Sequence, residues 1–348
     1  MDQPNHEMSV AQLGPRGPVV SRLALGTMTF GAETAAEEAH RQLDAFHDAG
    51  GTFLDTADVY ADGESERIVG EWLRSRGHDD VIVATKGRFA PPPGSPGASR
   101  RGLVRAIDAS LDRLGVDGID VYFVHGWDRD TPIEETLDVL SAEVRKGKLH
   151  AVGWSNVTGW QLSRLMTTAR LGGYVVPTVV QPQYNLLDRS IELEVLPCAI
   201  DEKLAVTPWS PLGGGWLTGK YQRDAQPTGA TRLGEDPNRG VEAYDTRNTE
   251  RTWQVLDVVE AVAERHDRSM AEVAVAWLLT RLNVASVLLG ARTLEQLQQV
   301  LPAASLALDA EDLEQLAAVS APGLPDYPYG VVESFSDMAI WKVLGTAG

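Results

Sequence analysis

The feature that most restricts the fold of this chain is a regular alternation of short apolar runs and amphipathic helical segments. Eight apolar runs occupy residues 23–26, 52–55, 81–85, 120–125, 151–155, 179–181, 205–209 and 286–289. Helical periodicity falls in residues 36–49, 65–76, 101–114, 133–146, 158–171, 191–202, 251–265 and 270–281. Such alternation is typical of parallel strands joined by crossover helices. Because a doubly wound sheet usually has ~5–6 strands, eight units predict an α/β fold of the (β/α)8 TIM barrel type.

The residues at the ends of these segments also support the barrel. Thr131 is predicted as an N-cap with Pro132 at the first helical position, and Gly147 is predicted to end the same helix. No GxGxxG or GxxxxGKS phosphate loop follows the first strand, which weakens the alternative of a dinucleotide-binding sheet. Two long loops, 87–99 and 222–249, follow strands and are predicted on the C-terminal face, where barrel enzymes carry their active sites. Long loops at this face favour a substrate pocket whose walls they form, and surface insertions without a function are the alternative.

Length and charge restrict the class of protein further. All 348 residues are predicted to form one barrel domain, 1–348, with an N-terminal segment 1–20 and a C-terminal tail 321–348. Lys+Arg 31 against Asp+Glu 49 gives a net charge of −18, which argues against nucleic acid or anionic lipid as a partner. The single cysteine, Cys198, excludes an intrachain disulfide and a zinc–cysteine cluster. Without a signal-peptide pattern or a run of ~18 apolar residues, a cytoplasmic protein with no membrane partner is predicted, and its oligomeric state stays open.

Ionisable residues stand where three consecutive strands end. Asp55 ends the second predicted strand, Lys86 the third and His125 the fourth, and Tyr60 follows in the loop after Asp55. In a barrel these side chains reach one rim, so Asp55 is expected to pair with Lys86, close to the hydroxyl of Tyr60. A cation beside a phenol lowers the phenol pKa from ~10, so Tyr60 is predicted to act as a general acid without metal. The alternatives are a surface tyrosine and a structural salt bridge.

Several segments carry a family resemblance. LDTADVY (54–60), ATK (84–86) and FVHGWD (123–128) resemble the catalytic motifs of the aldo-keto reductases. Other segments resemble this family in the family's order: LALGTMTFG (23–31), GKLHAVGWSN (147–156), VVQPQYNLLDR (179–189), TPWSPLGGGWLTGKY (207–221) and VLLGARTLEQL (287–297). The similarity is to the bacterial, potassium-channel-β-subunit-like branch. It implies a barrel that reduces carbonyl compounds with NADPH, in which Tyr60 is the general acid, Asp55 and Lys86 tune it, and His125 orients the carbonyl.

Residues at other strand ends suit a nicotinamide cofactor. Ser155, Asn156 and Gln181 offer donors and acceptors for a carboxamide. The family places an aromatic ring at Trp209 against the nicotinamide, and a core aromatic is the alternative. Glycines after Ser210 allow backbone N–H groups to approach a pyrophosphate. The resemblance implies cofactor contacts from Gly26, Thr27, Met28, Asp55, Ser155, Asn156, Gln181, Trp209, Ser210, Pro211, Leu212, Gly214, Leu217, Gly219, Lys220, Gly290, Arg292 and Gln296.

The end of the sequence bears on which nicotinamide cofactor binds. Arg292 is predicted to contact an adenosine 2′-phosphate because a guanidinium matches phosphate geometry, and a solvated surface arginine is the alternative. Gln299 and Val300 stand where the family usually has Glu-Asn for the adenine. Val300 cannot hydrogen-bond through its side chain. NADPH is therefore the predicted cofactor, and NADH is not excluded.

The predicted substrate-binding residues are Tyr60, Phe89, His125 and Trp127, with Met28 near the nicotinamide. Loop 222–249 and the tail aromatics are predicted to close the pocket; those aromatics are Tyr327, Tyr329, Phe335 and Trp341. For Phe89 and the tail aromatics, a core or surface role is the alternative. The expected substrate is an aldehyde or ketone, including a ketosugar. The competing hypothesis is an NADP(H)-binding regulatory or redox-sensing subunit with little turnover. A metal hydrolase is less favoured because His125 has no neighbouring histidine or carboxylate at ligand spacing.

Overall fold

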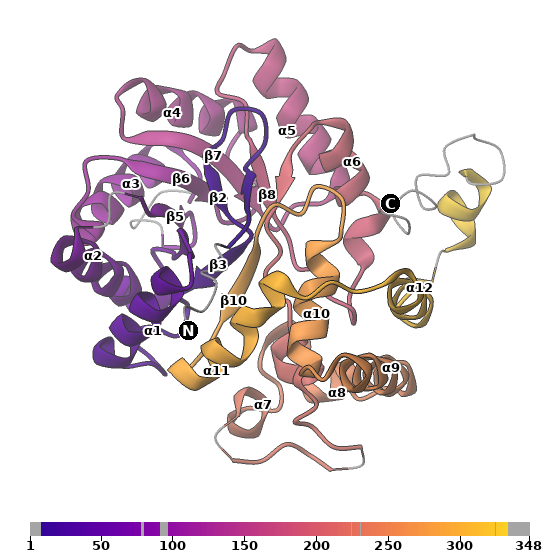
Figure 1. Cartoon of the computed structure of the whole chain (residues 1–348). Coiled ribbons are helices and arrows are strands. Elements are labelled where there is room, and N and C mark those ends of the chain that lie inside the picture. The colour runs from indigo at the N-terminus through magenta and orange to yellow at the C-terminus, as the bar shows by residue number, and fades with distance from the viewer. Residues whose placement is uncertain are drawn as a thin grey trace.

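Eight parallel strands form the centre of the molecule. The computed structural model describes residues 8–77, 80–90, 97–223, 225–229, 231–323 and 325–332. The strands follow the order β10-β3-β4-β5-β6-β7-β8-β9. Their bounds are β3 Leu23–Gly26, β4 Phe53–Asp55, β5 Ile82–Gly87, β6 Ile119–Val124, β7 Leu149–Ser155, β8 Val179–Gln181, β9 Ala205–Val206 and β10 Val287–Gly290. The sheet curls into a barrel (Figure 1), and the backbone N–H of Val206 donates to the carbonyl of Asn283 at 2.7 Å where the two outer strands meet. The predicted (β/α)8 barrel is confirmed.

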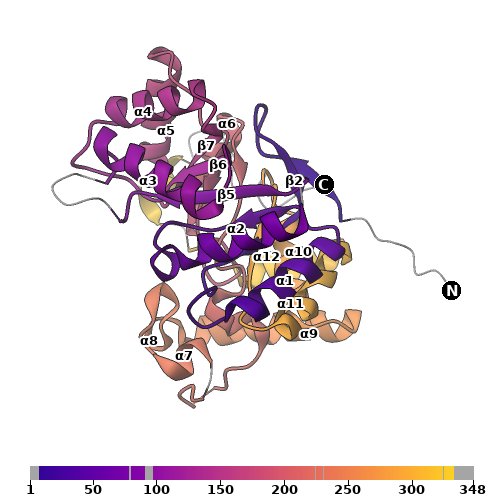
Figure 2. The same ribbon diagram turned by 90° about the vertical axis from the view of Figure 1, so that its left-hand side faces the viewer.

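Helices surround the strands and pack against them. Their bounds are α1 Ala36–Asp48, α2 Glu64–Arg76, α3 Arg100–Leu114, α4 Ile133–Arg145, α5 Gly159–Leu171, α6 Val195–Asp201, α7 Arg232–Glu235, α8 Tyr244–Arg247, α9 Glu250–His266, α10 Met270–Leu279, α11 Leu294–Val300 and α12 Ala310–Val319. Helices α1 to α4 pack side by side along one flank (Figures 1 and 2). In α3 the residues Leu103, Ile107, Leu111 and Leu114 are buried, at the spacing of one helical face. The loop predicted at 222–249 contains the short helices α7 and α8.

One predicted strand is shorter than expected, and one predicted helix is interrupted. The strand predicted at 205–209 is reduced to β9, and Pro208 has no N–H to continue the ladder. The helix predicted at 191–202 is interrupted at Glu194, whose φ of −143° is not helical. A 3-10 turn, Ser190–Leu193, precedes the break, and α6 follows it.

The start of α4 also differs from the prediction. The hydroxyl of Thr131 donates to the carboxylate of Asp128 at 3.1 Å and so does not cap the helix. Pro132 takes the N-cap position instead, with extended backbone before Ile133. The predicted helix end is confirmed, because Gly147 follows the C-cap with a φ of +77°.

An N-terminal hairpin closes the foot of the barrel, the end at which the parallel strands begin. Strands β1 (Val10–Gln12) and β2 (Val19–Ser21) pair antiparallel, with Ala11 opposite Val20. Leu13 and Val20 are fully buried and belong to the cluster that fills the barrel interior. This cluster is otherwise made of inward residues such as Phe53 and Phe123. The segment predicted only as an N-terminal extension, 1–20, therefore contains a structural plug.

Replacing Leu13 with Ala is expected to lower the free energy of unfolding by about 2–5 kcal/mol, the usual cost of a cavity at a buried leucine. Leu13 is 0 % exposed, and its neighbours are held by a closed ring of strands that cannot collapse onto the gap. Denaturant unfolding measures the change. Val19→Ala on the same hairpin is the control, since Val19 is 55 % exposed. Equal stability of Leu13→Ala and the wild-type protein would show that the hairpin is not part of the core.

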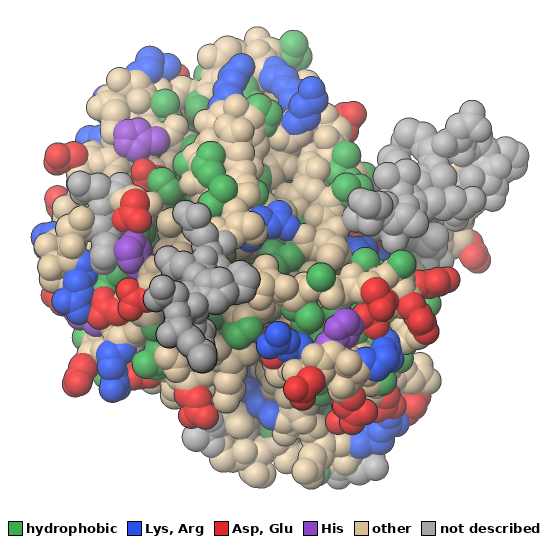
Figure 3. Space-filling model, in the orientation of Figure 1, with side chains coloured by type: hydrophobic (Ala, Val, Ile, Leu, Met, Phe, Trp, Pro, Cys, Tyr) green, Lys and Arg blue, Asp and Glu red, His purple; other side chains and the backbone are tan. Residues whose placement is uncertain are grey.

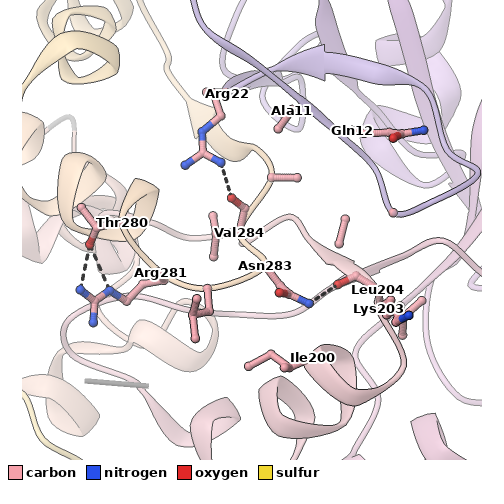
Figure 4. A pocket seen from close by; sticks show the side chains of 14 residues that line it. Ala11, Gln12, Arg22, Ile200, Lys203, Leu204, Thr280, Arg281, Asn283 and Val284 are labelled. Carbon is pink, nitrogen blue, oxygen red and sulfur yellow. Dashed lines mark hydrogen bonds between the residues drawn. The ribbon is translucent and has the colours of Figure 1, made fainter. Parts of the chain in front are cut away.

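A cavity of about 470 Å³ lies at this same foot, between the hairpin and residues 280–285. Figure 4 shows Arg22 at one end, where its guanidinium donates to the carbonyl of Val284 at 2.6 Å. The amide of Asn283 donates to the carbonyl of Leu204 at 2.9 Å. These contacts join the hairpin side of the foot to the loop before β9. The cavity is at the opposite end of the barrel from the carboxyl ends of the strands.

Acidic and basic groups are interspersed on the face displayed in Figure 3. In the described parts of the chain, none of the helices combines the length and the apolar character that crossing a bilayer requires.

Candidate active site

The predicted catalytic residues meet at the carboxyl ends of β4, β5 and β6. Lys86 is fully buried, and its Nζ donates to the carboxylate of Asp55 at 2.5 Å and to the backbone carbonyl of Thr56 at 2.7 Å. The same ammonium lies 3.3 Å from the hydroxyl of Tyr60. Parallel pairing of β4 with β5 places Asp55 opposite Ala84, two residues before Lys86. The strand register therefore brings the acid and the lysine together.

A left-handed turn holds Tyr60 over this pair. Tyr60 begins the 3-10 helix Tyr60–Gly63, in which Ala61 and Asp62 have φ values of +47° and +55°. Gly63 continues the turn at +86°, and a Cβ there would lie 2.7 Å from the side chain of Arg113. A glycine is thus required where the chain turns from the site into α2. The ring of Tyr60 meets the ring of His125 edge-on, with centroids 6.1 Å apart.

The predicted lowering of the pKa of Tyr60 is wrong. Burial raises the pKa of this phenol by more than Lys86 lowers it, and the negative charges of Asp55 and Asp58 act in the same direction as burial. The Lys86 ammonium, paired with Asp55 at 2.5 Å, still lowers the pKa of Tyr60, but by less than burial and the two carboxylates raise it. The pKa of Lys86 is itself raised: burial opposes the ammonium, but attraction to Asp55 and Tyr60 outweighs it. Tyr60 is therefore a neutral phenol beside a charged lysine at neutral pH.

His125 is a neutral imidazole in this site. Burial, reinforced by the positive charges of Lys86 and Arg88, lowers its pKa to about 3. Its Nδ1 atom is buried and has no hydrogen-bond partner among the described residues. The backbone carbonyl of His125 accepts from the side-chain amide of Asn156 at 3.0 Å, which ties the end of β6 to the end of β7. A neutral imidazole offers one N–H donor and one acceptor without a net charge.

The predicted nicotinamide residues form a hydrogen-bonded chain that ends on Asp55. The amide of Gln181 donates to the second oxygen of Asp55 at 2.8 Å. The hydroxyl of Ser155 donates to the backbone carbonyl of Gln181 at 2.8 Å. Beside them, the indole N–H of Trp209 donates to the side-chain oxygen of Asn156 at 3.1 Å. The ends of β7 and β8 and the segment after β9 therefore present amide, hydroxyl and indole groups next to the cluster of Asp55, Tyr60 and Lys86.

The glycine-rich loop after Trp209 has a left-handed backbone at several successive positions. Ser210 has a φ of +56°, and three glycines in succession have φ values between +56° and +96°. At Gly214 a Cβ would lie 2.8 Å from the side chain of Glu242, so only glycine fits. Glu242 also accepts from the amide of Gln183 and pairs with Arg247 at 2.6 Å, which anchors the loop to α8.

Cations gather beside this loop, at the end predicted for the adenosine phosphate. Burial lowers the pKa of Lys220, and the nearby charges of Arg292 and Arg232 lower it further. The Nε atom of Arg232 is buried without a hydrogen-bond partner in the described part of the chain. This mutual crowding of positive groups, with one donor unused, fits a phosphate ligand.

Arg292 is not free. Both of its terminal nitrogens donate to the carboxylate of Glu235 at 2.8 Å, and Glu33 lies 3.6 Å away. Gln296, another predicted contact, accepts from the backbone N–H of Arg292 at 2.9 Å. Val300 is buried at 8 % exposure in the core beneath α11.

The predicted substrate residues lie around His125. The ring centroid of Phe89 is 4.7 Å from that of His125, and the Phe89 side chain is 46 % exposed. Trp127 is half-buried against Trp160, and its backbone carbonyl accepts from the guanidinium of Arg88 at 2.7 Å. Met28 and the two predicted glycines Gly26 and Gly290 belong to the rim at the ends of β3 and β10.

The described part of the tail does not reach these residues. The hydroxyl of Tyr329 donates to Glu194, between the 3-10 turn and α6, and Tyr327 is 79 % exposed. In Figure 1 this segment projects beyond α12. Phe335 and Trp341 lie outside the described residues. The prediction that the tail closes the pocket is not supported by the two tyrosines that can be placed.

Four charged residues near the site were not predicted from the sequence: Arg88, Arg232, Glu235 and Glu242. Three of them belong to the loop predicted at 222–249, where no periodicity indicates which side chains point inward. In the described ranges, no group of three or more His, Cys, Asp or Glu side chains is arranged to hold a metal ion.

Comparison with known proteins agrees with this geometry. Residues 22–321 match the family model described as the aldo/keto reductase family. An uncharacterized oxidoreductase of Bacillus subtilis is 34% identical, covering 89% of this chain and 95% of the relative. A probable voltage-gated potassium channel subunit beta of Arabidopsis thaliana is 35% identical (84% and 90%), and an aryl-alcohol dehydrogenase [NADP(+)] of Phanerodontia chrysosporium is 30% identical (94% and 90%). The chain therefore belongs to the aldo/keto reductase family of oxidoreductases.

Proposed function

We propose that this protein is an NADPH-dependent reductase of aldehydes or ketones in which Tyr60 supplies the proton. The observation that carries the proposal is the buried Lys86, whose ammonium joins Asp55 at 2.5 Å and Tyr60 at 3.3 Å. Bound NADPH would supply the hydride, and the chain's own groups would handle the proton. The carbonyl oxygen would accept a hydrogen bond from the Tyr60 hydroxyl, and neutral His125 would orient it. As Tyr60 releases its proton, Lys86 stabilises the phenolate that forms.

The residues around the nicotinamide position support the same assignment. Gln181, Ser155 and Asn156 would hold a carboxamide, and Trp209 would lie against the ring. The exposed ring of Phe89 next to His125 favours a substrate with a flat or apolar part, as in an aromatic aldehyde. The test is consumption of NADPH by the purified protein with a panel of aromatic, aliphatic and sugar-derived carbonyl compounds. No turnover with any of them, despite tight cofactor binding, would reject the enzyme and favour the second candidate.

That second candidate is an NADP(H)-binding regulatory subunit with little turnover. The similarity to a plant protein named as a probable potassium channel subunit beta favours it. The complete set of Asp55, Tyr60, Lys86 and His125 in contact geometry favours the enzyme. Turnover number separates the two, because both would bind NADPH.

Glu235→Gln is expected to raise the affinity for NADPH about threefold to tenfold and to leave NADH affinity unchanged. The Glu235 carboxylate takes both terminal nitrogens of Arg292, so it competes with a 2′-phosphate for the same guanidinium. Titration of tryptophan fluorescence with each cofactor measures the effect through Trp209. Glu37→Gln, which removes an exposed acid four residues after Glu33 in the sequence, is the control. An equal rise for NADH, or for the control, would contradict competition at Arg292.

A further inference from the structure

Asp58 is a buried acid that the proposed reaction does not use. It lies between Asp55 and Tyr60 in the segment after β4 and is 7 % exposed. Its backbone N–H donates to the carbonyl of Lys86 at 2.9 Å, which fixes the residue against β5. Its Oδ1 atom is buried and has no hydrogen-bond partner among the residues that the structure describes. An ionised carboxylate is costly in such a place unless a cation pairs with it.

The cations that face Asp58 are already paired. Arg113, from α3, donates to the carboxylate of Glu66 at 2.6 Å, and Glu66 also accepts from the hydroxyl of Thr85 at 2.6 Å. Lys86, from β5, is paired with Asp55. Glu66 is itself completely buried on α2 and repels a charge on Asp58.

The remaining neighbour with a titratable group is Tyr122, from β6. Its hydroxyl is buried without a hydrogen-bond partner in the described ranges, and burial raises its pKa well above the usual value. Tyr122 is therefore neutral. The cluster thus holds three carboxyl groups, Asp55, Asp58 and Glu66, against two cations, and Asp58 is the one without a hydrogen-bonded cation.

Protonation relieves this imbalance in the neutral pH range. Burial and repulsion by Glu66 raise the pKa of Asp58 to about 7, against the attraction of Arg113 and Lys86 and a hydrogen bond that the carboxyl accepts from the backbone of Val59. The pKa of His125 is about 3, and those of Tyr60 and Lys86 are raised above their usual values. Among these four groups, Asp58 alone changes charge near neutrality.

The charge on Asp58 acts on Tyr60. A negative Asp58 raises the pKa of Tyr60, because it disfavours the phenolate that forms when the proton leaves. A phenol with a higher pKa is a weaker proton donor. Protonation of Asp58 removes this effect and leaves Lys86 to stabilise the phenolate.

We infer from this buried cluster that Asp58 is a positioning residue that sets the pH response of carbonyl reduction. While it holds its proton, Tyr60 is the better acid, and when it loses the proton to solvent, reduction slows. The inference rests on the proposed function, since it concerns the same proton transfer. It assigns Asp58 no contact with substrate or cofactor.

The experiment compares kcat/KM for reduction of one aldehyde in the wild-type protein and in Asp58→Asn, between about pH 5 and pH 9. The wild-type value is expected to fall through neutral pH, and the variant is expected to lack this fall. At about pH 8.5 the variant should exceed the wild type by about threefold to tenfold, because the amide keeps the neutral state. Asp62→Asn is the matched control: it removes an exposed acid from the same turn and should keep the wild-type profile.

Two outcomes overturn the inference. One is an unchanged inflection in Asp58→Asn, and the other is loss of the inflection in Asp62→Asn as well, which would reveal a general charge effect. Failure of the wild-type protein to reduce any carbonyl compound would reject the proposed function instead. In that case the pH dependence of thermal stability, which needs no activity, still tests whether Asp58 gains and loses a proton near neutral pH.

Proton binding by Asp58 determines in which direction thermal stability changes with pH. The pKa of Asp58 is about 7 in the folded protein and 3.8 is its ordinary value, so the folded state binds more protons between these limits. The wild-type protein should therefore lose stability relative to Asp58→Asn as pH rises from about 4 to about 7, and no further above that. Asp58→Ser serves both measurements if the asparagine variant does not fold. A difference in melting temperature that is constant with pH would show that Asp58 does not titrate there, and the inference would fail.

Discussion

Tyr60→Phe is expected to lower kcat for aldehyde reduction by about a hundredfold to ten-thousandfold, the range that general acid catalysis contributes. The substitution removes the hydroxyl that lies 3.3 Å from the Lys86 ammonium and keeps the ring that packs against His125. Water or His125 would have to supply the proton, and neutral His125, with a pKa of about 3, is a poor replacement for a phenol beside a lysine. Binding of NADPH should stay nearly unchanged, because Gln181, Trp209 and Arg292 are untouched.

The measurement is steady-state turnover together with a fluorescence titration of the cofactor, so that loss of chemistry is separated from loss of binding. Tyr174→Phe is the control. Tyr174 lies between α5 and β8, which places it at the end of the barrel opposite the site. Turnover of Tyr60→Phe within tenfold of the wild type would remove Tyr60 as the proton donor.

Lys86→Met is expected to abolish reduction and to destabilise the protein by about 3–5 kcal/mol, the usual result of leaving one member of a buried ion pair alone. The carboxylate of Asp55 is 1 % exposed and, among the residues that the structure describes, would keep only the amide of Gln181 as a side-chain donor. The backbone carbonyl of Thr56 would lose its ammonium donor as well. Denaturant unfolding measures the stability, and NADPH consumption measures the activity.

A double variant separates the two consequences. Asp55→Asn with Lys86→Met removes both charges, and its stability should return most of the way to that of the wild type, because an uncharged buried pair carries no unpaired ion. Its activity should not return, because nothing then stabilises the phenolate of Tyr60. If Lys86→Met alone unfolds at the wild-type denaturant midpoint, the pair makes no contribution to stability. If the double variant regains turnover, Lys86 has no electrostatic role.

Local sequence patterns predict much of this protein correctly, and the reasons are physical. Each strand of a parallel barrel is buried on both faces, so it appears as an apolar run, and most of the long helices bury one face, so their apolar residues recur at helical spacing. Asp55, Lys86 and His125 are visible because a polar residue at the end of an apolar run is unusual. Their meeting at one rim follows from the parallel order of β4, β5 and β6, which the alternation of strands and helices already implies.

The hairpin at the foot is less visible. β1 and β2 have three residues each, and Val10 and Val19 point outward, so no apolar run marks them. Leu13 and Val20 become core residues only because the curled sheet leaves an opening that they fill. Thr131 likewise has the sequence of a helix cap, and only the nearby Asp128 carboxylate shows that its hydroxyl is used elsewhere.

The sequence alone determined the barrel and the identity of the four residues at its rim, because periodicity and strand ends are local properties of the chain. Tertiary structure decided their electrostatics. The pKa of Tyr60 is raised rather than lowered because burial and the carboxylates of Asp55 and Asp58 outweigh Lys86. Glu235 reaches Arg292 from a distant loop. The two cations next to Asp58 are paired with other acids: Lys86 with Asp55, and Arg113 with Glu66. Charge interactions depend on distance and burial in space, and these are set only when segments far apart in the chain pack together.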